Sequence, residues 1–144
     1  MIRRMCAQEI ARVAELERSC FSCPWSLKLL EEGLLSPLDV YYVVEEEGLL
    51  CGYCDLRVIA GEGEIERIAV HPDCRGRGFA KQMMEQMVSF AKEQGVSEIT
   101  LEVRTGNLAA IRLYESYGFR EEAVRKGYYR EPLEDGIIMW LRGI

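Results

Sequence analysis

Apolar residues recur along the chain with two periods, about 3.6 residues and 2 residues, which predict helices and strands respectively. The helical period is clearest from Phe79 to Gln94, where alanines and methionines form one stripe, charged residues lie away from it, and Gly95 closes the segment. We expect the methionines of this stripe to pack in the core. Further helices are predicted over residues 8–20, 26–34 and 107–118.

Alternation of apolar and polar residues predicts the strands. They cover residues 2–5, 40–44, 49–58, 64–70, 99–104, 119–124 and 137–141, with a loop rich in Tyr and Glu joining the last two. In one strand the alternation slips, because Ile65 lies on one phase while Ile68 and Val70 lie on the other. A β-bulge would produce this slip, and an edge strand with mixed faces would look similar. The order of elements predicts an α/β fold with a mixed sheet.

Length and charge limit the classes of protein. With 144 residues, the chain is expected to form one domain. The net charge of −6 argues against binding to nucleic acid or to an anionic membrane and suits a basic or amine-bearing partner. No apolar run approaches the roughly 18 residues of a membrane-spanning helix, and the first residues lack the apolar core of a signal peptide. We therefore expect a cytoplasmic protein.

Six cysteines include two Cys-x-x-Cys pairs, Cys20/Cys23 and Cys51/Cys54, which on paper resemble a four-thiolate zinc site. The second pair falls on a predicted strand. Residues three apart on a strand point to opposite faces, so those two thiolates could not share a metal ion. We expect free thiols and no metal.

The segment Val70–Lys81 is the sharpest local feature. A strand ends, Pro72 stops the pairing, and a turn rich in glycine and arginine leads directly into a helix. Such a turn offers unpaired backbone N–H groups at a positive helix end, which suits a diphosphate. The dinucleotide fingerprint is absent because Lys81 stands at its third glycine, and a P-loop is absent too. A tight turn with solvated arginines is the alternative.

The pattern Arg75-x-x-Gly78-x-Ala80 matches the acyl-CoA pyrophosphate motif of the GNAT N-acetyltransferases, Gln/Arg-x-x-Gly-x-Gly/Ala. The preceding strand, the following helix, Asn107 and the segment Leu113–Phe119 stand in the family's order. The chain thus resembles this family over essentially its whole length. The resemblance implies one N-acetyltransferase domain over residues 1–144, with a mixed, mostly antiparallel sheet splayed between two central parallel strands and flanked by helices.

Within the family, the sequence is most similar to the bacterial enzymes that acetylate the N-terminal alanine of a ribosomal protein. The similarity lies in residues 24–26, 101–104, 107, 109–111, 128–129 and 134–139. Cys23 stands where many relatives carry Phe, and Gly136 where they carry Ala, so the substrate side departs from the pattern. The implied partners are acetyl-CoA as co-substrate and the N-terminal peptide of a small-subunit ribosomal protein, with no metal, nucleic acid or membrane.

The resemblance also implies roles for individual residues. Ile68, Ala69 and Val70 would bind the pantetheine and polarise the thioester carbonyl. Arg75 would open the pyrophosphate-binding segment, which comprises Gly76, Arg77, Gly78, Phe79, Ala80 and Lys81. Asn107 would bind the far end of the pantetheine. Glu102 corresponds to the general base and Tyr114 to the general acid, which suits an α-amine that is mostly protonated at neutral pH and a thiolate that must take up a proton.

Each role has an alternative from pattern alone. Glu102 could be an exposed strand carboxylate, and Tyr114 a core tyrosine of the helix stripe. His71, the only histidine, is expected to be a loop residue rather than a base. The acidic stretches could steer a basic N-terminal tail or form a solvated face; they are Glu45–Glu47, then Glu62, Glu64 and Glu66, then Glu131, Glu134 and Asp135. A GNAT enzyme for another amine and a non-catalytic acyl-CoA-binding module are the competing functions.

Overall fold

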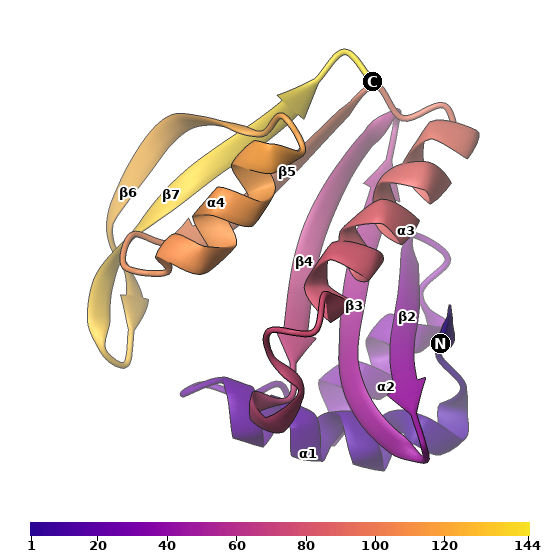
Figure 1. The fold of residues 1–144 in the computed structure, drawn as a ribbon. Coiled ribbons are helices and arrows are strands. Elements are labelled where there is room, and N and C mark those ends of the chain that lie inside the picture. Colours follow the sequence, from indigo (N-terminus) through magenta and orange to yellow (C-terminus); the bar gives the residue numbers. More distant parts are fainter. The chain divides into compact units, whose positions relative to one another are not determined.

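A computed structural model describes all 144 residues and contains seven strands and four α-helices (Figure 1). The strands are β1 (Ile2–Arg4), β2 (Asp39–Glu46), β3 (Leu49–Ile59), β4 (Glu62–Val70), β5 (Glu98–Arg104), β6 (Arg120–Arg130) and β7 (Leu133–Arg142). The helices are α1 (Ile10–Cys20), α2 (Leu27–Leu35), α3 (Phe79–Glu93) and α4 (Leu108–Ser116), with short 3₁₀ helices at Ala7–Glu9 and Pro72–Cys74.

The strands form one sheet in the order β1-β2-β3-β4-β5-β7-β6. β1–β2, β2–β3, β5–β7 and β6–β7 are antiparallel pairs, whereas β4 and β5 are parallel. The parallel register pairs Glu62–Ile65 with Glu98–Leu101, and both strands continue beyond it. The predicted α/β class with a mixed, mostly antiparallel sheet is confirmed.

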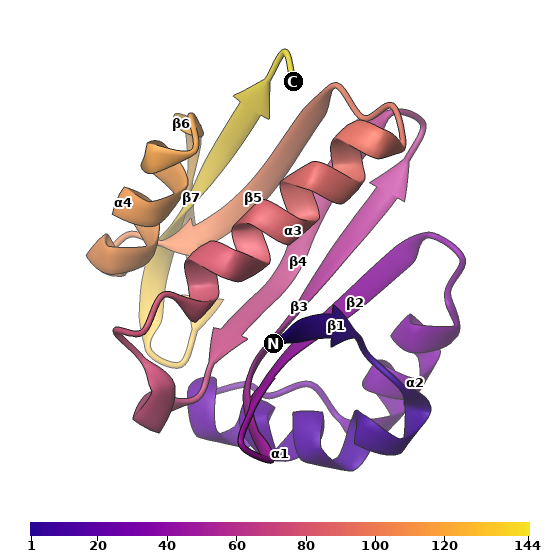
Figure 2. The same ribbon diagram turned by 45° about the vertical axis from the view of Figure 1, so that its right-hand side comes forward.

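The chain divides into two compact units, which share the sheet. The first comprises Met1–Arg57 and Glu66–Phe90. Here α1 and α2 cover one face of β2 and β3, and α3 covers the other (Figures 1 and 2). On the α1–α2 face the core contains Val13, Ala14, Leu16, Leu30, Tyr41, Val43 and Tyr53. In α3 the methionines Met83, Met84 and Met87 are completely buried, which confirms their predicted packing role.

The start of α1 differs from the prediction. A 3₁₀ turn replaces the expected first helical residues because the buried Glu9 reaches back to accept the Cys6 N–H at 2.8 Å. The Arg3 guanidinium clamps the same carboxylate at 2.6 and 2.7 Å. At α2 the predicted cap is confirmed, since Ser26 Oγ accepts the Leu29 N–H at 3.2 Å.

The second unit comprises Val58–Ile65 and Ala91–Ile144. Ile99, Leu101 and Val103 of β5 are buried, as their alternation predicts, and Asn107 caps α4 by accepting the Ala110 N–H at 3.3 Å. The predicted loop between the last two strands is wrong. β6 runs to Arg130 and β7 starts at Leu133. The sequence does not show this because β6 is mostly exposed, so no apolar alternation marks it.

In β4 two consecutive side chains lie on the same face of the sheet. Glu66 forms an ion pair with Arg57 at 3.7 Å beside α2, while Arg67 forms an ion pair with Glu17 of α1 at 2.9 Å. Side chains alternate in a regular strand, so β4 changes phase between these residues. The change falls where the sequence predicts a bulge, between Ile65 and Ile68.

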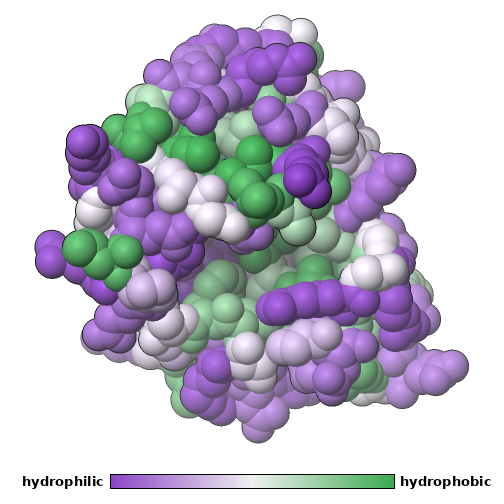
Figure 3. All heavy atoms as spheres, turned by 60° about the vertical axis from the view of Figure 1, so that its left-hand side comes forward, coloured by the Kyte–Doolittle hydropathy of each residue, from purple (hydrophilic) through white to green (hydrophobic).

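The surface seen in Figure 3 is mostly hydrophilic, with apolar side chains in patches between the charged ones. No helix is both long enough and apolar enough to cross a membrane.

Candidate active site

The C-terminal end of β4 carries the residues predicted to bind the pantetheine. Ala69 is buried, and Ile68 and Val70 are half-buried. The Val70 carbonyl accepts Arg75 Nε at 3.2 Å and the Cys20 thiol at 3.3 Å, which ties this strand end to the following loop and to α1. Gly52 of the first unit permits this packing, because a Cβ there would lie 2.7 Å from the Ala69 carbonyl oxygen.

The segment from His71 to α3 is a turn with two left-handed glycines. Gly76 has φ +77° and Gly78 has φ +84°, and a Cβ at either would enter open space. The Gly78 carbonyl accepts the Gln82 N–H where α3 begins. The backbone N–H groups before Gln82 in this first turn therefore have no partner within the helix. His71 lies in the loop, as predicted, and its side chain accepts the Asp73 N–H at 3.0 Å, which caps the short 3₁₀ helix. The geometry fits a bound phosphate group.

A buried carboxylate on α1 organises the segment between α1 and α2. Glu17 has no exposed surface; it accepts a hydrogen bond from the Tyr53 hydroxyl, and Arg67 donates to it at 2.9 and 3.0 Å. It also accepts the Trp25 N–H at 2.7 Å. The Arg67 guanidinium covers the ring of Trp25 at 4.6 Å and that of Phe21 at 3.9 Å. Removing one partner of such a buried pair costs about 3–5 kcal/mol.

Sequence reasoning missed this network. Glu17 falls one residue away from the apolar Leu16 of α1 and was not distinguishable from the solvated charges of that helix. The position of Glu17 in the helix is the signal that could have indicated its burial, because Val13, Leu16 and Glu17 have the spacing of one buried face.

In the second unit, Glu102 projects from β5 with one unpartnered oxygen. The side chain is half-buried, and its Oε2 is buried without a hydrogen-bond partner. Tyr128 lies beside Glu102. The pKa of the Tyr128 phenol is raised, chiefly by burial and then by the hydrogen bond with Glu102 and the charge of that residue. Buried carboxylate oxygens without partners are rare and call for a functional explanation. The alternative of a fully solvated strand carboxylate does not hold.

Tyr114 of α4 is buried and packs against Phe119, with ring centroids 6.1 Å apart. Burial, with a smaller contribution from Tyr129, raises the pKa of its phenol well above the ordinary value. The hydroxyl therefore remains protonated at neutral pH and is available as a hydrogen-bond donor. Core packing and proton donation are compatible at this position, because the ring packs while the hydroxyl stays a donor.

Two further features shape this unit. Gly136 stands against the rings of Tyr128 and Tyr129, and a Cβ there would lie 3.2 Å from each. Glu134 accepts the Gly106 N–H at 2.6 Å and pairs with Arg104 at 3.3 Å, and these contacts, the first above all, lower the pKa of its carboxyl. Glu134 thereby fixes the turn that presents Asn107.

Several predicted acidic residues have structural partners. Glu45 pairs with Arg3 at 2.6 Å and with Arg12 at 3.3 Å, and Asp135 accepts the Gly127 N–H at 2.8 Å. Together with Glu134, these residues hold the fold, which differs from both alternatives considered for them. Glu66 instead lines a pocket in the first unit.

All six cysteines are free thiols. Cys51 and Cys54 are both buried in β3. Cys74, at the start of the glycine-rich loop, lies next to Cys51 of β3. The pKa of Cys74 is raised to about 11, chiefly by burial and then by its hydrogen bond with Cys51. The Cys74 thiol therefore remains protonated at neutral pH, and the buried cysteines pack as small apolar groups.

Comparison with known proteins agrees with these features. The family model described as the acetyltransferase (GNAT) family matches residues 10–119, and the chain belongs to this family. The [ribosomal protein bS18]-alanine N-acetyltransferase of Escherichia coli K12 is 32% identical over 128 residues, which cover 88% of this chain and 86% of that protein. The N-alpha-acetyltransferase RimI of Mycobacterium tuberculosis is 36% identical over 134 residues, 89% of this chain and 83% of that protein.

The same class emerges from structure. The crystal structure of the ribosomal-protein-S18-alanine N-acetyltransferase from E. coli matches with a TM-score of 0.91 and 29% identity, covering 99% of this chain and 92% of that one. The resemblance stated from the sequence is therefore confirmed, and with it the prediction of an acetyltransferase.

Proposed function

We propose that this protein transfers the acetyl group of acetyl-CoA to the N-terminal α-amine of a protein, namely the N-terminal alanine of a small-subunit ribosomal protein. The observation that carries the catalytic part is the buried, unpartnered Oε2 of Glu102. Membership of the GNAT family and the activities for which the E. coli and M. tuberculosis relatives are named support the substrate class.

The reaction is a direct transfer in a ternary complex. Glu102 takes a proton from the α-ammonium group, directly or through one water, and the freed nitrogen lone pair attacks the thioester carbonyl carbon. The C–N bond forms as the C–S bond breaks, and the departing thiolate takes the Tyr114 hydroxyl proton. The nitrogen loses its second proton as the amide forms; this proton restores the Tyr114 hydroxyl through a water molecule, and Glu102 releases its own proton to solvent. The products are an N-acetyl amide and free CoA. Neither step requires a cysteine nucleophile.

Most residues on the acetyl-CoA side of the proposal belong to the first unit, and Asn107 belongs to the second. Backbone groups of Ile68–Val70 would bind the pantetheine and polarise the thioester carbonyl. The amides from Gly76 to Lys81, preceded by Arg75, would bind the pyrophosphate at the positive end of α3. Asn107, fixed by its capping bond and by the Glu134 turn, would hold the far end of the pantetheine.

The test is a panel of acceptors assayed for CoA release with saturating acetyl-CoA. It contains short peptides that begin with alanine, the same peptides with a blocked N-terminus, peptides with one internal lysine, and free small amines. We expect release with the free alanine N-termini and loss of that release on blocking. Release that survives blocking would identify another amine as the acceptor, and acetyl-CoA binding without release from any member would indicate a non-catalytic module.

Replacing Tyr114 with phenylalanine tests the general acid. The ring stays in its packing site against Phe119, and only the buried hydroxyl is removed. We expect kcat to fall about 10- to 100-fold with little change in acetyl-CoA affinity, because one proton donor is lost. Raising the pH should not rescue it, since the missing group donates a proton. Tyr117→Phe, at the C-cap of the same helix, is the matched control, and an equal loss there would assign the effect to packing.

A further inference from the structure

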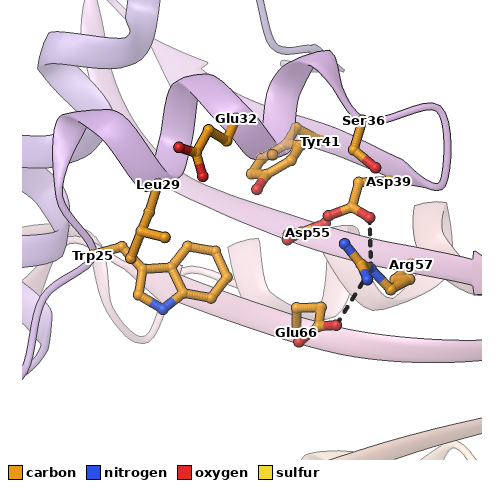
Figure 4. Close-up of a pocket in the computed structure, with 10 residues that line it drawn as sticks. Trp25, Leu29, Glu32, Ser36, Asp39, Tyr41, Asp55, Arg57 and Glu66 are labelled. Carbon is orange, nitrogen blue, oxygen red and sulfur yellow. Dashed lines mark hydrogen bonds and ion pairs between the residues drawn. The ribbon is translucent and has the colours of Figure 1, made fainter.

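A pocket of about 370 Å³ lies between α2 and the strands β2, β3 and β4 of the first unit (Figure 4). One end is apolar and is formed by Trp25 and Leu29. The other end is acidic and contains Asp39, Asp55 and Glu66. The chain's own Arg57 lies at this end, with Nε 2.8 Å from Asp39 and 3.7 Å from Glu66.

Asp55 distinguishes this pocket from an ordinary acidic surface. It is 99% buried, and its Oδ1 is inaccessible and has no hydrogen-bond partner. Its carboxylate lies beside Asp39 and Tyr41 in the pocket wall (Figure 4). A buried carboxylate oxygen without a donor is costly to the fold, so its position in a pocket points to a donor supplied by a ligand.

The charge balance of the pocket specifies that ligand. Four carboxylates line it, since Glu32 of α2 adds to the three at the acidic end, and Arg57 is the single cation among the lining residues. Burial first, and then the charge of Asp39, raise the pKa of the Asp55 carboxyl to about 8. Even with Asp55 protonated, the carboxylates outnumber the guanidinium, which disfavours anions and favours a cation with several N–H donors.

We propose that this pocket binds the guanidinium or ammonium group of a basic side chain in the acceptor polypeptide, downstream of the amine that is acetylated. The aliphatic stem of such a side chain would lie along Trp25 and Leu29, while its head group would donate to Asp55 and Glu66. This inference rests on the proposed function for the identity of the polypeptide.

Distance along β4 supports this source of the cation. Glu66 precedes Ile68 by two residues and Val70 by four, so at about 3.3 Å per residue the pocket lies roughly 7–13 Å from the strand end where the thioester is proposed to bind. An extended polypeptide rises by the same amount per residue. A basic side chain at about the third to fifth position of the acceptor would therefore match this separation.

The buried Asp55 carboxyl, with its unpartnered Oδ1, also predicts a measurable cost to the fold. A carboxyl group whose pKa is raised in the folded state holds its proton while the unfolded chain has already lost it. Stability therefore falls as pH rises from about 4 to about 8. Asp39, Tyr41, Arg57 and Glu66 are the titratable groups that interact with Asp55, and Glu32 lines the same pocket. Asp55→Asn should raise the urea midpoint relative to the unmutated protein, by an increment that grows between pH 4 and pH 8. A constant or reversed increment would contradict the conclusion that the buried Asp55 carboxyl destabilises the fold as pH rises.

The binding test compares two acceptor peptides that begin with alanine and differ only in carrying arginine or its uncharged isostere citrulline at positions three to five. Affinity for the CoA-loaded protein is measured by calorimetry, and kcat/KM separately by CoA release. At pH 9, where the Asp55 carboxyl is ionised, Asp55→Asn should weaken binding of the arginine peptide about ten- to hundredfold, and Glu32→Gln about two- to threefold. The citrulline peptide should lose far less.

Glu31→Gln is the matched control, because Glu31 neighbours Glu32 on α2, is also exposed, and does not line the pocket. Equal affinity of the unmutated protein for both peptides, or an equal loss for both in Asp55→Asn, would overturn the proposal. So would binding of n-butylguanidinium alone without discrimination between peptides, which would assign the pocket to a free cation. Calorimetry needs no turnover, so a peptide that binds without being acetylated would overturn the proposed function and leave the pocket standing.

Discussion

Glu102→Gln is expected to lower kcat by about 10²–10⁴-fold, the usual contribution of one general base. Glutamine keeps the size of the side chain and its place beside Tyr128 but cannot take a proton from the α-ammonium group. Because an α-amine has a pKa near 8, raising the pH supplies more acceptor that is already deprotonated, and activity should be partly restored. The measurement is a pH–rate profile at saturating acetyl-CoA.

Glu98→Gln provides the control for this substitution. Glu98 lies on the same strand and the same face as Glu102, but its carboxylate is partly exposed and pairs with Arg142 at 2.5 Å. Its loss should leave the pH–rate profile unchanged. A Glu102→Gln enzyme with unaltered kcat at neutral pH would show that another group, or a chain of waters, removes the proton.

Gly78→Val is expected to raise the KM for acetyl-CoA by at least about tenfold while the fold persists. Gly78 adopts φ +84°, where a residue with a side chain is strained by about 1–3 kcal/mol. The open space in front of its Cα is where the proposed pyrophosphate would contact the backbone, so a branched side chain would block that approach. Steady-state kinetics and circular dichroism of the same preparation separate binding from folding.

Gly48→Val is the control for Gly78→Val, because it should introduce a similar backbone strain. Gly48 has φ +80°, also faces open space, and lies in the turn between β2 and β3 of the same unit. The two variants should lose similar stability, but only Gly78→Val should lose cofactor affinity. Equal KM values would remove the glycine-rich loop from the acetyl-CoA site.

The sequence predicted those parts of the fold that bury one face of a regular element. The α3 methionines and the β5 alternation are examples, because each places apolar side chains at the period of its element. The phase change of β4 was also visible, since a slip in the pattern moves apolar residues to the other face. β6 could not be predicted, because a mostly exposed strand carries no such signal.

The candidate site also has residues that the sequence identified and residues that it did not. Motif spacing found the loop from Arg75 to Lys81, and the resemblance supplied Glu102 and Tyr114. What the sequence could not show is which charged side chains are buried. Glu17, Glu134 and Asp55 are ordinary acidic residues in the printed sequence, and their importance comes from partners, or a missing partner, far away along the chain.

The Glu17 network has a consequence for the thermodynamics of ligand binding. Trp25 is held at its backbone by Glu17 and at its ring by Arg67, so the segment between α1 and α2 is ordered before any ligand arrives. A ligand that contacts Trp25 therefore spends little of its interaction energy on immobilising this wall, where each freshly ordered side chain would otherwise cost about 0.5–1.5 kcal/mol. Loosening the Arg67–Glu17 pair would transfer that cost to binding and make association entropically less favourable, even if every contact in the final complex were unchanged.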